Sequence, residues 1–112
     1  MDGLLFDEDI FMYMDEIDLL FRAKKKGYTV YFYPEANVMH IGSGSSIDKR
    51  KGPILNIFRG LQLFYKKHYP GWHMPILRGM LQCKAFFGII IGLMTGNSVL
   101  KTIYEEALRL VQ

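Results

Sequence analysis

The chain has 112 residues, a net charge of +3 and a hydrophobic content of 50%. This composition excludes a disordered tail and suits one domain with a modest core, and the mild charge without a basic stripe excludes nucleic-acid binding. The single cysteine, Cys83, excludes an internal disulfide framework and favours a reducing compartment. The acidic N-terminus, Met1-Asp2-Gly3, lacks the basic region of a secretory signal.

The first half of the chain predicts one helix followed by two extended segments. Residues 15–26 carry acids in the first turn and lysines in the last, which matches the helix dipole, and Gly27 supplies a stop. Tyr28–Tyr33 is rich in β-branched and aromatic residues, so it predicts a strand that ends at Pro34. Asn37–Ile41 predicts a second, shorter extended segment.

The second half predicts helices. Gly42–Gly52 has the composition of a flexible loop whose distal part is basic, and Pro53 is well placed to begin a helix that Tyr69-Pro70-Gly71 would end. Pro75–Met94 is strongly apolar, and its Gly88 and Gly92 have the spacing that permits close helix contact. A last helix is expected from about Ser98, with Asn97 as its cap.

Acidic residues gather at the start of the first predicted helix. Asp15, Glu16 and Asp18 fit two interpretations, a capping cluster that interacts with the helix dipole or a general base crowded by like charges. His40 also has two interpretations, a hydrogen-bonded rim residue or a ligand for a divalent ion, and one histidine alone is not a metal site.

The ordered spacing of many residues over about residues 3–46 resembles the C-terminal half of the catalytic domain of family 2 glycosyltransferases, of the GT-A type. The closest similarity is to the bacterial rhamnosyltransferase-like branch that makes cell-surface polysaccharides. A less specific similarity covers Phe58–Tyr69, with its run Lys66-Lys67-His68-Tyr69. The first match rests on Phe6-Asp7-Glu8, Phe11-Met12-Tyr13, Asp15-Glu16-Ile17-Asp18-Leu19, Arg22, Gly27-Tyr28, Pro34-Glu35-Ala36 and His40.

This resemblance implies roles for individual residues. The family's catalytic base falls on Glu16, although the order of the acidic pair is swapped here, so Asp15 is an alternative base. Asp18 would bind acceptor hydroxyls or orient the base, and Tyr13 is a further candidate for acceptor binding. His40 would help to hold a divalent metal, Mg²⁺ or Mn²⁺, on the donor diphosphate.

The loop residues Lys49 and Arg50 would close over that diphosphate, and the alternative is a solvated charged loop. The implied reaction is the inverting transfer of a sugar from a nucleotide-sugar donor to a saccharide or lipid-linked acceptor.

The expected fold class is α/β, a partial GT-A domain that lacks the N-terminal nucleotide-binding half of the family and continues into C-terminal helices. Residues 1–52 would form the acceptor-side part of the transferase domain, and residues 53–112 a helical region with possible membrane association. Asp7-Glu8-Asp9 superficially matches an Asp-x-Asp metal motif but occupies a different position of the family pattern. The chain is therefore expected to be inactive without a partner chain that supplies the missing half.

The apolar stretch Pro75–Met94 has two interpretations. Lys84 near its middle disfavours a membrane span, so one expectation is a helix at the membrane interface, with Arg78 and Lys84 reaching the headgroups. The alternative is ordinary packing against a partner. The expected location is cytoplasmic, peripheral to the inner face of the cytoplasmic membrane.

Two rival functions remain open. One is a non-catalytic transferase remnant that binds a partner chain or a membrane, which the swapped acidic pair and the absent donor half would explain. The other is a small metal-binding protein that uses Asp15, Glu16, Asp18 and His40.

Overall fold

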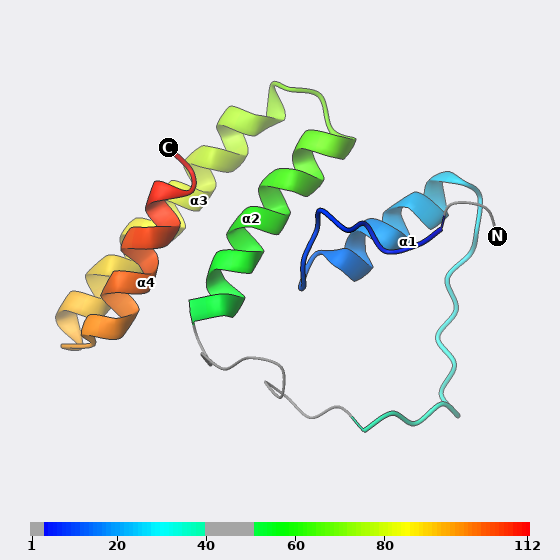
Figure 1. Cartoon of the computed structure of the whole chain (residues 1–112), viewed down its shortest axis with the longest axis horizontal. Coiled ribbons are helices and arrows are strands. Elements are labelled where there is room, and N and C mark those ends of the chain that lie inside the picture. The colour runs from blue at the N-terminus through cyan, green and yellow to red at the C-terminus, as the bar shows by residue number, and fades with distance from the viewer. Residues whose placement is uncertain (1–3, 40–50) are drawn as a thin grey trace.

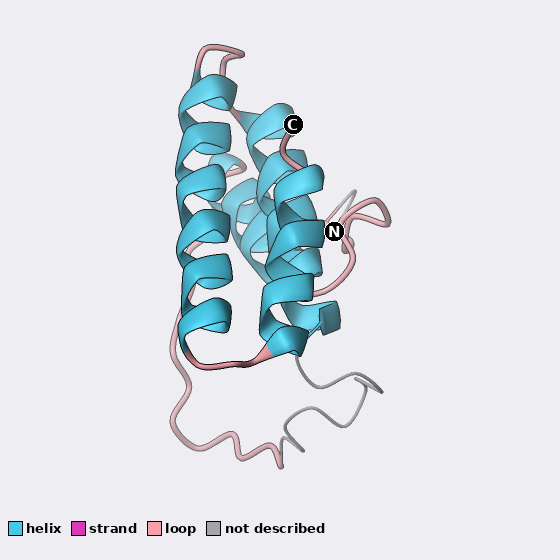
Figure 2. Ribbon diagram, turned by 90° about the vertical axis from the view of Figure 1, so that its left-hand side faces the viewer, coloured by secondary structure: helices cyan, strands magenta, loops and turns pink. Residues whose placement is uncertain are grey.

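The computed structural model describes residues 4–39 and 51–112, and the regular structure in these residues is entirely helical (Figures 1 and 2). The helices are α1 (Asp15–Lys25), α2 (Lys51–His68), α3 (His73–Met94) and α4 (Ser98–Arg109). α3 and α4 form a hairpin, α2 packs against both, and α1 lies on the other side of α2 (Figure 1).

Two hydrophobic clusters share α2. The larger cluster joins α2 to α3 and α4 and is built on the fully buried Phe58, with partners Leu55, Leu77, Leu81, Ala85, Ala107 and Val111. The smaller cluster joins α2 to α1 and the segment before it, through Ile10, Met14 and Phe64. Leu61 and Tyr65 of α2 contact both clusters, so the position of α1 depends on the same helix that organises the C-terminal hairpin.

Local sequence signals set the helix ends. Gly27 has a φ of +85°, and the backbone N–H groups of Gly27 and Tyr28 donate to the carbonyls of Lys24 and Ala23, which closes α1 in a Schellman motif. The Asn97 side chain accepts a hydrogen bond of 3.0 Å from the Leu100 backbone N–H and caps α4. The predicted stop at Gly27 and the predicted cap at Asn97 are therefore confirmed.

The prediction of an α/β fold is wrong for the residues that the structure describes, because they contain no strand or sheet. Tyr28–Tyr33 is not helical, but it is not a strand either, and Tyr31 and Phe32 are 83% and 91% exposed. A β-strand needs a neighbour that pairs with its backbone N–H and C=O groups, and no other described segment supplies one. Asn37–Met39 likewise forms no strand, and the rest of the predicted segment Asn37–Ile41 lies outside the described residues.

The α3–α4 hairpin depends on two glycines of α3. A Cβ atom on Gly88 would overlap the ring of Tyr104, and one on Gly92 would lie 2.8 Å from the backbone nitrogen of Lys101. An aromatic ring can turn aside, whereas the backbone of α4 moves only if the helix moves. The Gly-x-x-x-Gly spacing therefore provides the close approach of the two helices, with Gly92 the less tolerant position.

Replacing Gly92 with alanine is expected to lower the free energy of unfolding by about 1–3 kcal/mol, the usual range for overpacking. Gly79→Ala is the matched control, because it lies in the same helix with open space around its Cβ position. The control should be neutral or should stabilise the chain by up to about 1 kcal/mol through helix propensity. Urea denaturation followed by circular dichroism measures both, and equal stabilities of the two variants would contradict the packing assigned to Gly92.

Candidate functional site

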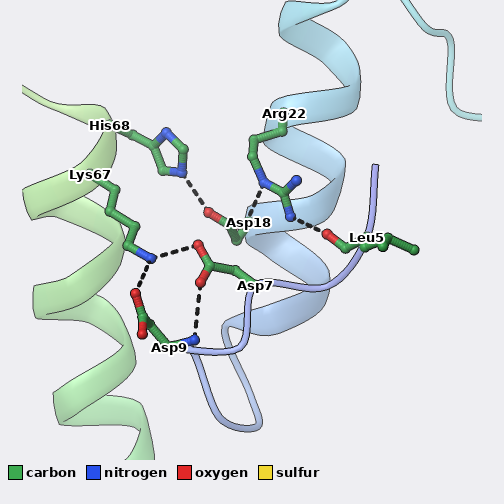
Figure 3. A network of polar contacts seen from close by, with 7 residues as sticks. All are labelled: Leu5, Asp7, Asp9, Asp18, Arg22, Lys67 and His68. Atoms are coloured by element: carbon green, nitrogen blue, oxygen red, sulfur yellow. Dashed lines mark hydrogen bonds and ion pairs between the residues drawn. The ribbon is translucent and has the colours of Figure 1, made fainter. Parts of the chain in front are cut away.

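The candidate site lies where α1 and the segment before it meet the C-terminal end of α2, and its centre is the carboxylate of Asp18 (Figure 3). Asp18 is fully buried. Its Oδ2 accepts a hydrogen bond of 2.7 Å from Arg22 Nε, one turn further along α1, and its Oδ1 lies 2.5 Å from His68 Nε2 at the end of α2. Both carboxylate oxygens therefore have partners, as a buried carboxylate requires.

His68 is held in place by its neighbours. Its ring lies between Phe21 of α1 and Phe64 of α2, with centroid distances of 4.7 Å and 4.9 Å. Only 10% of its side chain is exposed. Because a carboxylate accepts hydrogen bonds, the Nε2–H of His68 is the donor to Asp18. The imidazole therefore links the two helices across 50 residues of sequence.

Arg22 extends the network to the segment before α1. Its Nη2 donates a hydrogen bond of 2.6 Å to the backbone carbonyl of Leu5. One guanidinium thus contacts both the buried carboxylate and the incoming chain, which suits its rigid fork of donors.

A second ionic contact joins the same segment to α2. Lys67 Nζ lies 2.6 Å from Asp7 Oδ2 and 2.8 Å from Asp9 Oδ2 (Figure 3). The hydrogen bond from Lys67 lowers the pKa of the Asp7 carboxyl below its ordinary value of 3.8, and the hydrogen bonds to Asp7 and Asp9 raise the pKa of Lys67 above 10.5. Asp7-Glu8-Asp9 is therefore placed by α2, and its two aspartates bind an ammonium group.

The predicted catalytic acids occupy the first turn of α1, immediately after an unusual backbone. Met12 and Tyr13 have φ values of +52° and +76°, a region that costs non-glycine residues about 1–3 kcal/mol and persists where the surrounding structure imposes it. Met14 follows, is buried, and packs against Phe64 and against Gly60, where an added Cβ would lie 2.8 Å from Met14 Cγ. The start of α1 is thus fixed by the packing of Met14.

Asp15 and Glu16 are presented between two fixed points, the buried Met14 and the buried Asp18. Glu16 is exposed and Asp15 is partly exposed, and neither side chain makes a hydrogen bond or ion pair within the described residues. The N-terminus of α1 has no side-chain cap, so the acids interact with the helix dipole without capping the helix by hydrogen bonds.

The structure separates Asp18 from Glu16, whereas Asp15 lies about 60° from Asp18 around the helix and is partly exposed. At 100° per residue, Asp18 projects about 160° around the helix from Glu16, and it faces α2 while Glu16 faces solvent. Tyr13 precedes the acidic pair by two residues and is 38% exposed. His40, Lys49 and Arg50, the predicted metal and diphosphate contacts, lie outside the described residues.

No group of three or more histidine, cysteine or acidic side chains is arranged to hold a metal ion within residues 4–39 and 51–112. Asp18 is already bonded to Arg22 and His68, so it is a poor candidate for a ligand set with Asp15 and Glu16. Two surface hollows are lined by other residues, one by Lys51, Ser98, Val99, Thr102 and Ile103, and one by Lys66, Gly71, Met74, Pro75 and Arg78.

The sequence did not identify Lys67 or His68 as site residues. Both belong to the run Lys66-Lys67-His68-Tyr69, and nothing in the sequence connects that run to Asp7 or Asp18. Both residues lie in the last turn of an amphipathic helix, where the helix dipole alone favours basic side chains, so their position does not indicate a site.

Comparisons with known proteins found no match among protein-family models, curated proteins or solved structures. The resemblance to family 2 glycosyltransferases therefore rests on the residues quoted for it.

Loss of the Asp18 carboxylate is expected to release α1 from α2. Asp18→Ala leaves Arg22 and His68 without their shared acceptor in a buried site, which typically costs about 3–5 kcal/mol. Hydrogen exchange followed by mass spectrometry should show lost protection over α1 while α3 and α4 keep theirs. Asp9→Asn, at a 73% exposed side chain, is the control and should change protection little. Unchanged exchange of α1 in Asp18→Ala would contradict the anchoring role.

The Lys67 contacts give the stability of the chain a defined pH dependence. The lowered pKa of Asp7 means that its contribution is present above pH 3.8 and is lost as the pH falls through the folded-state value. The raised pKa of Lys67 means that its contribution is complete below pH 10.5 and is lost as the pH rises through the folded-state value. The stability difference between the wild type and Lys67→Met should therefore be constant at neutral pH and shrink at both extremes.

Because these side chains lie near the surface, the difference at neutral pH should be about 0.2–1 kcal/mol. Denaturant titrations across the pH range measure it, and Lys66→Met at the neighbouring exposed position is the control. A difference that changes through the neutral range would indicate that another group carries the effect.

Proposed function

We propose that this chain is the acceptor-side part of an inverting glycosyltransferase, which transfers a sugar from a nucleotide-sugar to a saccharide or lipid-linked acceptor. The observation that supports the proposal is that two acids of the match over residues 3–46 contact the run Lys66-Lys67-His68-Tyr69, which belongs to the second, less specific similarity. Asp7 pairs with Lys67, and Asp18 pairs with His68, across 60 and 50 residues of sequence. A chance likeness of scattered residues would not require these contacts.

In this proposal, Glu16 is the general base and Asp15 is its alternative. A carboxylate that takes the proton of an acceptor hydroxyl must reach the acceptor and have an unshared oxygen, and both acids meet this requirement at the exposed start of α1. The deprotonated hydroxyl oxygen attacks the anomeric carbon of the donor sugar. The bond from that carbon to the nucleoside diphosphate breaks, and the configuration inverts.

Asp18 is a positioning residue in this account. Its carboxylate is buried against α2 and holds α1 through His68 and Arg22, so it orients the helix start that carries Glu16. Tyr13, exposed beside the acidic pair, is the described residue best placed to contact the acceptor. Catalytic groups gain their effect from such fixed placement, because a displacement of about 1 Å can reduce a rate 100-fold.

A divalent ion on the donor diphosphate belongs to the family's chemistry, in which it neutralises the leaving group. The described residues do not form a ligand set for it, so the proposal assigns none of them to the ion. His40, Lys49 and Arg50 keep their proposed roles at the donor diphosphate, and the nucleotide-binding half is proposed to be a separate part of the enzyme.

Glu16→Gln is expected to reduce sugar transfer by 10²–10⁴-fold, the usual contribution of general-base catalysis, while donor binding is retained. The assay combines this chain with the polypeptide encoded directly upstream and measures nucleoside diphosphate release over a panel of nucleotide-sugars. Asp15→Asn distinguishes the two candidate bases. Glu105→Gln on α4, at a side chain 41% exposed, is the matched control and should leave the rate unchanged.

Transfer at the wild-type rate by both Glu16→Gln and Asp15→Asn would exclude these acids as the base. A stable complex that transfers no sugar from any donor would reject the enzyme and favour the alternative function.

That alternative is a non-catalytic module that binds a partner chain, and one observation favours it. The segment Tyr28–Tyr33 exposes Val30, Tyr31, Phe32 and Tyr33, each more than half accessible, without a covering element among the described residues. Isothermal titration with the upstream polypeptide would test it: tight binding that Tyr31→Ser and Phe32→Ser abolish, without transfer activity, is the result that this function requires.

A further inference from the structure

The outer face of α3 is apolar and exposed, and it carries no charged side chain. Leu77, Leu81, Ala85, Gly88 and Gly92 form the buried stripe of this helix, and they face α2 and α4. At 100° per residue, the opposite side carries the turn residue Trp72 and the helix residues Ile76, Met80, Phe87, Ile90 and Met94. Their exposed fractions run from 47% to 83%. We call these six residues the outer stripe.

Basic residues flank the outer stripe, and acids are missing from α3. Arg78 and Lys84 project about 120° from the direction opposite the buried stripe, one on each side. His73–Met94 contains no aspartate or glutamate. At the α2–α3 turn, beside Trp72, Lys66 and Arg78 line the same hollow. The face therefore combines an apolar centre with a positive border, and the surface that it complements is apolar with a negative border.

We propose that α3 lies in the plane of an anionic lipid surface. The outer stripe enters the boundary between headgroups and acyl chains, Arg78 and Lys84 contact headgroup phosphates, and Trp72 anchors one end. Amphipathic helices with cations beside an apolar face bind membranes in this way, and tryptophan is enriched at the interface. This inference is independent of whether the chain transfers a sugar.

Two other arrangements fit the structure less well. Within the described residues, α3 is the helix long and apolar enough to cross a membrane. A span, however, would place Lys84 near the bilayer centre. It would also bring the ion pairs Lys51–Glu106 and Lys101–Glu105 of the packed helices into the hydrocarbon region, where charged side chains are costly.

A second copy of the chain is the other arrangement. Two α3 helices packed face to face would bring their arginines and lysines together, and neither helix has an acid to pair with them.

The binding test uses the whole chain and its only tryptophan. Vesicles of phosphatidylcholine with about one third phosphatidylglycerol, a composition that provides the anionic potential, should float the chain and shift Trp72 emission to the blue. Phosphatidylcholine vesicles should bind it much more weakly. Equal binding to both vesicles would contradict the charge complementarity, and binding to neither would reject the proposal.

Matched variants locate the binding face. Phe87→Glu with Ile90→Glu should abolish flotation, because both side chains lie in the outer stripe. Tyr31→Glu with Phe32→Glu changes two aromatic residues elsewhere that are more exposed, and it should leave flotation unchanged. Arg78→Gln and Lys84→Gln should each weaken vesicle binding by roughly fivefold, the equivalent of about 1 kcal/mol per cation near an anionic surface.

The depth of α3 can be measured without substituting any of the six stripe residues, because Cys83 is the chain's single cysteine, is exposed, and lies midway along the helix. A nitroxide on Cys83 should reside roughly 5–10 Å below the headgroups if the helix lies in the plane. A spanning helix would place it near the centre, about 15 Å from either side of the hydrocarbon core. A nitroxide near the bilayer centre would overturn the proposal. A dimer in solution that Phe87→Glu with Ile90→Glu dissociates would overturn it as well.

Discussion

The contact between the carboxylate of Asp18 and the imidazole of His68 is the interaction on which the arrangement of the N-terminal part depends. It joins α1 to α2 through two residues that are 50 positions apart in sequence, and one of them is a fully buried carboxylate. A buried carboxylate is tolerated only where its oxygens are satisfied, so α1 can occupy this position only when His68 and Arg22 are both in place. Lys67 adds a second, more exposed contact from the same end of α2 to the segment before α1.

This junction has a consequence for the acidic helix start. Met14 packs against α2 on one side of the acidic pair, and Asp18 is bonded on the other, so Asp15 and Glu16 are carried by a backbone fixed at both ends. Left-handed φ values at Met12 and Tyr13 turn the chain sharply into the helix. Exposed carboxylates on a rigid, strained support are more typical of a site that acts on a ligand than of a helix cap, and this is the physical basis of the proposed base.

The parts of the fold that depend on local chemistry followed from the sequence. Apolar residues at helical spacing, Gly27 and Asn97 predicted the helices and two of their ends, because these signals act within a few residues. Tyr28–Tyr33 was predicted as a strand because its residue types favour one. Strand formation also requires a pairing partner, and within the described residues none is present, so propensity alone gave the wrong fold class.

The candidate site was predicted only in part for a similar reason. Asp15, Glu16 and Asp18 were recognisable as an acidic group, but their division into two exposed acids and one buried anchor depends on which face of α1 meets α2. The partnership of Asp18 with His68 is a long-range contact that no periodicity encodes. The structure therefore changes the interpretation of the motif: Asp18 joins α1 to α2, whereas the side chains of Asp15 and Glu16 make no hydrogen bond or ion pair within the described residues.

A double-mutant cycle between Asp18 and His68 tests the central claim most directly. The free energies of unfolding of Asp18→Ala, His68→Ala and the double variant are compared with that of the wild type. If the contact holds α1 on α2, the double variant is less destabilised than the sum of the single variants, with a coupling energy of about 1–3 kcal/mol. Additive effects, within about 0.5 kcal/mol, would contradict the account, because the two side chains would then contribute independently.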